Sequence, residues 1–136
     1  MSSRASGIAV FGDQRGAAFA DFNRDGRLDL AISQNGAATK LYQNVGAKKG
    51  LIVQLVGPPG NPTAVGAQIR LHYPGNRLGP AREIQAGSGY WSVNSPVQVM
   101  GLDGEADGVW VRWPGGKETI EPIQRGQTKV RLIHPN

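Results

Sequence analysis

Four oxygen-bearing side chains between residues 21 and 29 have the spacing of a loop that wraps a hard cation. They occupy positions 1, 3, 5 and 9 of the segment: Asp21, Asn23, Asp25 and Asp29. Ca²⁺ takes about six to eight oxygen ligands, and a glycine serves where such a loop bends sharply, here Gly26 at position 6. The Arg27 carbonyl at position 7 would add a backbone oxygen, and water would complete the shell. The spacing therefore predicts a calcium site rather than a magnesium site, because Mg²⁺ prefers fewer protein ligands.

The same residues admit a second interpretation that needs no metal. An EF-hand is excluded, because its twelfth loop position requires glutamate and this chain has Ile32 there. In an Asx-turn hairpin, however, the carboxylates would accept hydrogen bonds from backbone N–H groups of the loop itself. Four oxygen ligands and a glycine at matching positions favour calcium over this closed hairpin.

Three further acidic residues and the two histidines suggest weaker chemistry. Asp103, Glu105 and Asp107 alternate along the chain, which could hold a second cation weakly but is more typical of a solvated hairpin loop. His72 and His134 have no carboxylate or second histidine at ligand spacing. We therefore predict neither a histidine-based zinc site nor a histidine general base.

The second half of the chain contains four prominent aromatic residues: Tyr90, Trp91, Trp110 and Trp113. Aromatic faces stack on the C–H faces of sugars, so Tyr90 and Trp91 could form a ligand-stacking surface, although tryptophan in a small β domain usually belongs to the core. The pair leaves an alternative function open, a carbohydrate-binding or glycan-processing fragment with its site in the loops between residues 74 and 108. Because no catalytic motif accompanies those loops, we do not predict an enzyme.

The composition excludes several functional classes. The chain has 136 residues, a formal net charge of +5 and no cysteine, which excludes disulfides and cysteine-based metal sites. No apolar stretch approaches the ~20 residues of a transmembrane helix, and residues 1–6 lack the apolar core of a signal peptide. The basic residues are scattered, whereas nucleic-acid-binding proteins gather them on one face, so nucleic acid is not an expected partner.

Short apolar runs separated by turn residues predict an all-β fold. The chain contains 20 glycines and 9 prolines, and apolar and polar residues alternate between them. The first strands are predicted as a three-stranded meander at residues 16–22, 28–33 and 40–43. After a junction, further strands are predicted at residues 51–56, 67–73, 82–85, 97–100, 108–113, 118–121 and 128–133. This spacing is typical of a small antiparallel β-sandwich or barrel-like domain.

Alternation within the strands also predicts the buried side chains. The residues expected in the core are Ile69, Leu71, Tyr73, Val109, Val111, Trp113, Val130 and Leu132. A lone meander cannot bury its own faces, so residues 10–45 are expected to pack on the second domain or on another copy of the chain. Open strand edges also permit self-association.

The first third of the chain resembles the FG-GAP/VCBS repeat, the calcium-loop blade of integrin-like β-propellers. The resemblance rests on residues 15–33, on Asn35-Gly36 and on residues 41–44. It implies Ca²⁺ as the cofactor, and it implies these ligands: the side chains of Asp21, Asn23, Asp25 and Asp29, and the carbonyl of Arg27.

The rest of the chain resembles the ASPIC/UnbV domain, most clearly at residues 51–57, 65–69, 86–90 and 109–116. The two resemblances imply three parts: an N-terminal segment (1–15), expected to be poorly ordered, an FG-GAP/VCBS-like repeat (16–47) and an ASPIC/UnbV-like β domain (48–136). They imply a non-enzymatic calcium-binding module of a larger exported protein. Such a module would lie in the extracellular space or periplasm and serve adhesion or recognition of a protein or glycan.

Overall fold

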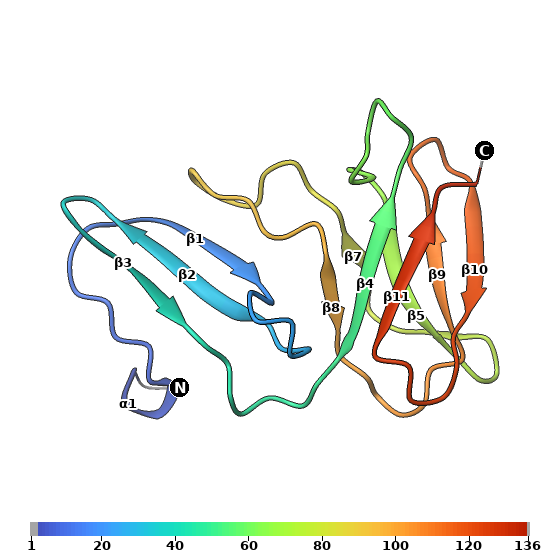
Figure 1. Ribbon diagram of the computed structural model, residues 1–136, viewed down its shortest axis with the longest axis horizontal. Helices are drawn as coiled ribbons and strands as arrows, with labels where there is room; N and C mark the ends of the chain where they lie inside the picture. The colour runs from blue at the N-terminus through green and yellow to red at the C-terminus, as the bar shows by residue number, and fades with distance from the viewer. Residues whose placement is uncertain (1–2, 136) are drawn as a thin grey trace.

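The computed structural model describes residues 3–135, with the side chains of residues 5–135, and is almost entirely β (Figure 1). It begins with the helix α1 (Ser3–Ser6) and a sheet in the order β1-β2-β3, formed by β1 (Gln14–Ala20), β2 (Asp29–Gln34) and β3 (Ala37–Tyr42). The later strands are β4 (Leu51–Val56), β5 (Gln68–Tyr73), β6 (Arg77–Leu78), β7 (Arg82–Glu83), β8 (Gln98–Met100), β9 (Gly108–Arg112), β10 (Glu118–Pro122) and β11 (Lys129–Ile133). The all-β prediction is confirmed. Within the described residues no helix is long and apolar enough to cross a membrane, as predicted.

The meander forms where it was predicted, but two of its strands begin earlier. β1 begins at Gln14, two residues before the predicted start, and β3 begins at Ala37, three residues before it. Asn35 and Gly36 form a two-residue turn with Gly36 at a φ of 68°, so Ala37 lies directly opposite Gln34. Pairing therefore resumes at once after the turn, and the partner strand rather than local propensity sets where β3 starts.

The other strands form two sheets that pack face to face around one core (Figure 1). One sheet has the order β10-β9-β5-β6, with β7 also paired to β5, and the other has the order β11-β4-β8. All eight residues predicted for the core are buried, and Leu51, Val53 and Leu55 of β4 join them. The predicted sandwich is thus confirmed, and in the described residues its sheets do not close into a barrel.

One strand pair differs from the predicted antiparallel arrangement. β11 runs parallel to β4, with Lys129 opposite Ile52 and Ile133 opposite Val56, whereas β8 pairs antiparallel with β4. Side chains alternate between the two faces of a strand in either direction of pairing, so the sequence pattern does not distinguish the two. β4 is consequently the central strand of its sheet, between neighbours that come much later in the sequence.

The meander touches the β domain through loops. The long connection from β7 to β8 reaches toward β1 (Figure 1), where the Phe19 amide donates to Asn94 Oδ1 and the Ser95 amide donates to the Phe19 carbonyl, each at 2.9 Å. In the loop that follows β1, the Gly26 carbonyl accepts a hydrogen bond from the Gly50 amide at 2.8 Å. These are loop contacts, and no described residue of the meander belongs to the buried hydrophobic core, so packing of residues 10–45 on the second domain or on another copy of the chain stays a prediction.

Candidate functional site

The predicted calcium loop connects β1 to β2 and turns through two left-handed residues. Arg24 has a φ of 60° and Gly26 a φ of 86°. The loop wraps around the Asp21 carboxylate. Its Oδ1 accepts a hydrogen bond from the Asp25 amide at 2.9 Å, and its Oδ2 accepts one from the Gly26 amide at 2.8 Å. Glycine adopts this backbone conformation without steric cost, so Gly26 has the bending role that its position predicts.

Asn23 and Asp25 continue the same network. Asn23 Oδ1 accepts from the Asp25 amide at 3.1 Å, and Asp25 Oδ1 accepts from the Arg27 amide at 2.9 Å. Asp25 Oδ2 accepts from the Asn23 side-chain amide at 3.2 Å and from the Arg27 guanidinium at 3.0 Å. Burial raises the pKa of Asp25, but the hydrogen bonds from Asn23 and Arg27 outweigh it and hold the pKa of that carboxyl below its ordinary value. Asp25 is therefore ionised at neutral pH.

Asp29 is the most deeply buried of the predicted ligands, with 2% of its surface exposed. Its Oδ2 accepts a hydrogen bond from the Phe22 amide at 3.2 Å, and its Oδ1 accepts one from the Asn44 amide at 2.7 Å. The carboxylate thus joins the loop, the start of β2 and the segment after β3. This link between the loop and the segment after β3 was not predicted from the sequence.

Arg27 was predicted to act through its carbonyl, and its side chain has a second role. Its guanidinium Nε donates to the Ala47 carbonyl at 2.6 Å, while Nη1 forms the ion pair with Asp25. The hydrogen bond from the Gly50 amide to the Gly26 carbonyl lies in the same region. The predicted calcium loop is therefore fixed against the junction between the meander and the β domain.

The predicted ligands match a hard cation in chemistry, but the structure does not cluster them. Within residues 3–135, no three acidic or histidine side chains are arranged as a metal-binding group. The carboxylates of Asp21, Asp25 and Asp29 accept backbone hydrogen bonds, as the metal-free Asx-turn hairpin also requires. Each carboxylate oxygen has two lone pairs, so an oxygen that accepts one hydrogen bond keeps capacity for a cation, whereas Asp25 Oδ2 already accepts two. The calcium site stays a prediction.

The fold separates the four aromatic residues into buried and exposed groups. Trp113 lies in the core, and Trp110 lies on the outer face of β9, with the Arg70 guanidinium 5.9 Å from its ring centre. Tyr90 and Trp91 are 65% and 83% exposed, and their rings stack with centres 5.6 Å apart and an interplanar angle of 24°. The pair singled out as a ligand-stacking surface therefore lies outside the core.

The fold gives His72 a carboxylate partner, which corrects the sequence analysis. His72 Nδ1 lies 2.5 Å from Asp107 Oδ1, and Nε2 lies 3.2 Å from Asn76 Oδ1. Asp107 immediately precedes β9, and the pairing of β9 with β5 brings it beside His72. The hydrogen bond to Asp107, assisted by the one to Asn76, outweighs burial and raises the pKa of His72.

Asp103 and Glu105 do not join Asp107 in a second cation site. Asp103 Oδ2 lies 3.5 Å from Arg77 Nη1, and Glu105 Oε1 lies 2.6 Å from Arg125 Nη2. Each acidic side chain of this loop thus has its own basic partner, in keeping with the favoured interpretation of a solvated loop.

Protein stability is expected to fall as the pH rises through the folded-state pKa of His72. Pairing raises this pKa above the unfolded value of about 6.5, so the stabilisation is complete below about pH 6.5 and is lost at higher pH. Melting temperatures of the wild type and His72→Gln, measured from about pH 5 to about pH 9, should differ most at low pH and converge at high pH. Asp107→Asn should reproduce the His72→Gln profile. A constant difference across this range would contradict the assignment.

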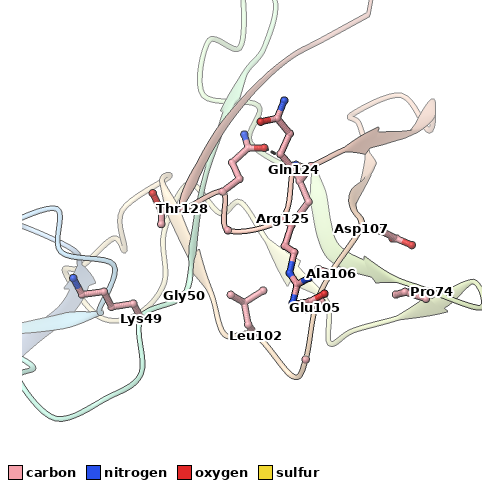
Figure 2. Close-up of a pocket in the computed structure, with 14 residues that line it drawn as sticks. Lys49, Gly50, Pro74, Leu102, Glu105, Ala106, Asp107, Gln124, Arg125 and Thr128 are labelled. Carbon is pink, nitrogen blue, oxygen red and sulfur yellow. Dashed lines mark hydrogen bonds and ion pairs between the residues drawn. The ribbon is translucent and has the colours of Figure 1, made fainter.

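A hollow of about 520 Å³ lies between the loop before β9 and the turn that joins β10 to β11 (Figure 2). Its apolar lining comes from Leu102, Ala106 and Ile123. Both acidic residues of the lining have basic partners: Glu105 pairs with Arg125, and Asp107 pairs with His72.

Comparison with known proteins identifies the β domain. The family model for ASPIC and UnbV matches residues 57–136, which is more than half of the chain. The match begins directly after β4 and leaves the meander outside. The comparison with curated proteins finds no relative that matches. The chain therefore belongs to the ASPIC and UnbV family.

Proposed function

We propose that the chain is a non-enzymatic calcium-binding module of a larger exported protein, used for adhesion or recognition in the extracellular space or periplasm. Residues 16–47 would form an FG-GAP/VCBS-like repeat whose cation is held by the loop between β1 and β2. The observation that carries the proposal is the place of this loop, which contacts the segment that joins the meander to the β domain.

Three hydrogen bonds tie the loop and its end to that segment. They join Gly26 to Gly50 at 2.8 Å, Arg27 to Ala47 at 2.6 Å, and Asp29 to Asn44 at 2.7 Å. A cation that orders the loop would therefore also order the junction, and its binding free energy would appear as folding stability. A module built this way presents its two parts at a fixed angle, which suits a recognition surface.

The charges of the loop support a site of modest affinity. Asp25 is ionised at neutral pH and Asp21 lies on the same loop, so two carboxylates are available to a divalent cation. The Arg27 guanidinium, however, already contacts Asp25 Oδ2 at 3.0 Å. A cation that binds this oxygen must displace the guanidinium, and the lost ion pair lowers the net affinity.

Calcium is expected to raise the melting temperature of the wild type and not that of Asp21→Asn/Asp25→Asn. At a free calcium concentration 100 times Kd, binding adds about 2.7 kcal/mol of stability, or roughly 10 °C for a protein of this size. Titration calorimetry and thermal melts in EDTA and in millimolar calcium would measure both effects. The calcium-dependent shift is the readout, because the double variant also loses loop hydrogen bonds.

The charge-matched control is Asp103→Asn/Glu105→Gln, which removes the same two charges from an exposed loop. Its surface ion pairs are worth little, so it should bind calcium and shift as the wild type does. Absence of binding heat and of a melting shift at millimolar calcium would refute the calcium site. A shift kept in Asp21→Asn/Asp25→Asn would place the cation elsewhere, and a shift lost equally in both double variants would indicate a dependence on net charge rather than on the loop.

A further inference from the structure

The turn at residues 89–92 carries its two largest side chains where turns usually have small ones. Gly89 and Ser92 form a β-bridge, and the Ser88 amide donates to the Ser92 carbonyl at 3.1 Å. Tyr90 and Trp91 are thus the central residues of the turn, and Trp91 has a φ of 51°. Glycine, asparagine or aspartate normally occupy such a position, and a bulky residue there is a genuine outlier.

Folding does not explain this choice of residues. Trp91 is 83% exposed and Tyr90 is 65% exposed, so neither contributes much buried area. Each ring stacks on the other, which leaves the outer faces of the pair open to solvent. Unfavourable backbone conformations that persist without a packing benefit tend to occur at ligand-binding sites, and the observed outlier leads to that hypothesis here.

The turn is held firmly against the meander. A β-carbon at Gly16 of β1 would lie 3.0 Å from the Trp91 carbonyl oxygen and 3.2 Å from that of Tyr90, so glycine permits a close approach of the two backbones. The Asn94 amide donates to Ser88 Oγ at 2.8 Å, and Asn94 in turn accepts from β1. The aromatic pair is therefore presented by a fixed support rather than by a free loop.

A hollow of about 490 Å³ lies between the turn and β1, within the usual size range of small-ligand sites. Its lining includes Tyr90, three apolar residues and several residues with hydrogen-bonding side chains: Ala17, Phe19 and Ile32, and Gln14, Arg15, Ser88, Ser92 and Asn94. An aromatic face beside convergent polar groups suits a ligand that has one apolar face and many hydroxyl groups.

We propose that the 89–92 turn and the adjoining hollow bind a carbohydrate, with the C–H face of a pyranose ring stacked on Tyr90 or Trp91. Hydroxyl groups of the sugar would hydrogen-bond to polar side chains of the hollow, Arg15 foremost. A membrane interior or an apolar protein surface would desolvate the Arg15 guanidinium of the lining without offering it an acceptor, whereas sugar hydroxyl groups can hydrogen-bond to it. This inference rests on the recognition part of the proposed function and does not depend on calcium.

The test is binding of cellohexaose and chitohexaose, two oligosaccharides of flat equatorial pyranose rings. Binding is measured by titration calorimetry in EDTA, because Trp91→Gly removes the tryptophan whose fluorescence would report it. Saturable binding is expected for at least one of them, with an affinity at least tenfold lower in Trp91→Gly. Glycine suits the left-handed backbone at this position, so Trp91→Gly should remain folded. Trp91→Phe should recover part of the lost affinity, because a smaller aromatic ring still stacks.

Phe11→Ala is the matched control, since Phe11 is an 89% exposed aromatic outside the proposed site, and it should bind as the wild type does. Asp21→Asn/Asp25→Asn should also bind, which separates failure of the calcium site from failure of the carbohydrate site. No saturable binding of either oligosaccharide at about 10 mM, or wild-type affinity in Trp91→Gly, would overturn the proposal. Binding of anionic phospholipid vesicles in place of the oligosaccharides would also overturn it.

Discussion

Replacing Gly57 with alanine is expected to destabilise the β domain by about 3 kcal/mol or more. A β-carbon at this position would lie 2.1 Å from the Asn61 carbonyl oxygen and 3.1 Å from the Ala64 amide nitrogen. The backbone there cannot easily yield, because the Asn61 side chain makes two hydrogen bonds of 2.9 Å with the backbone of Val65. Ala64 is fully buried and has a φ of 56°, which restricts the segment further. Overpacking against fixed backbone explains the size of the loss.

Urea unfolding curves of the two variants Gly57→Ala and Gly60→Ala provide the measurement. Gly60 lies on the same loop, but a β-carbon there would meet no atom within 4 Å. Its replacement should therefore change the free energy of unfolding by no more than about 0.5 kcal/mol. Similar losses in the two variants would show that the loop tolerates an added methyl at Gly57 and that the close approach is not a constraint.

The second large effect is expected at Asp29, where alanine should destabilise the meander by about 3 kcal/mol. The substitution removes a buried carboxylate and leaves the amides of Phe22 and Asn44 without their acceptor. Hydrogen bonds to charged groups contribute about 1.5–3 kcal/mol each, and unsatisfied buried donors add a cost. Asp29→Asn keeps one acceptor oxygen, so its loss should be intermediate.

Hydrogen exchange in EDTA separates this structural role from any role in calcium binding. In Asp29→Ala, the amides of Phe22 and Asn44 should exchange much faster, while the amides of β4 and β9 in the β domain should keep most of their protection. Asp13→Ala serves as the control, since Asp13 is an exposed acid next to β1 and its ion pair with Arg15 is a surface contact. Unchanged exchange at both amides would rule out Asp29 as the hydrogen-bond centre of the meander.

Local alternation was enough to predict the core but not the pairing of the strands. Ile69, Leu71 and Tyr73 are buried as predicted. Successive side chains of a strand point to opposite faces, so neighbouring residues alone indicate which side chains are buried. The short strand β6 was missed, since two residues carry no detectable period and its pairing depends on the turn at Gly75 and Asn76. The parallel direction of β11 was missed for a similar reason, as it depends on the path of the whole chain.

The candidate sites show the same limit. The spacing of residues 21–29 predicted one loop, and those residues do lie in one loop, but spacing alone did not show that Asp29 is buried against Asn44 or that Arg27 reaches Ala47. The pair of His72 and Asp107 could not be found either, because it exists only once β5 and β9 are paired. Contacts between distant segments require the fold, whereas ligand chemistry can be proposed from the sequence.

The parallel pair of β4 and β11 has a consequence for how the protein is made. β4 leaves the ribosome long before β11. The edge of β4 that pairs with β11 therefore stays unpaired while the intervening residues are synthesised. Pairings between segments far apart in sequence form slowly, and an open apolar strand is exposed to aggregation in the meantime. The β domain is therefore expected to complete its fold only after residues 129–133 have emerged from the ribosome.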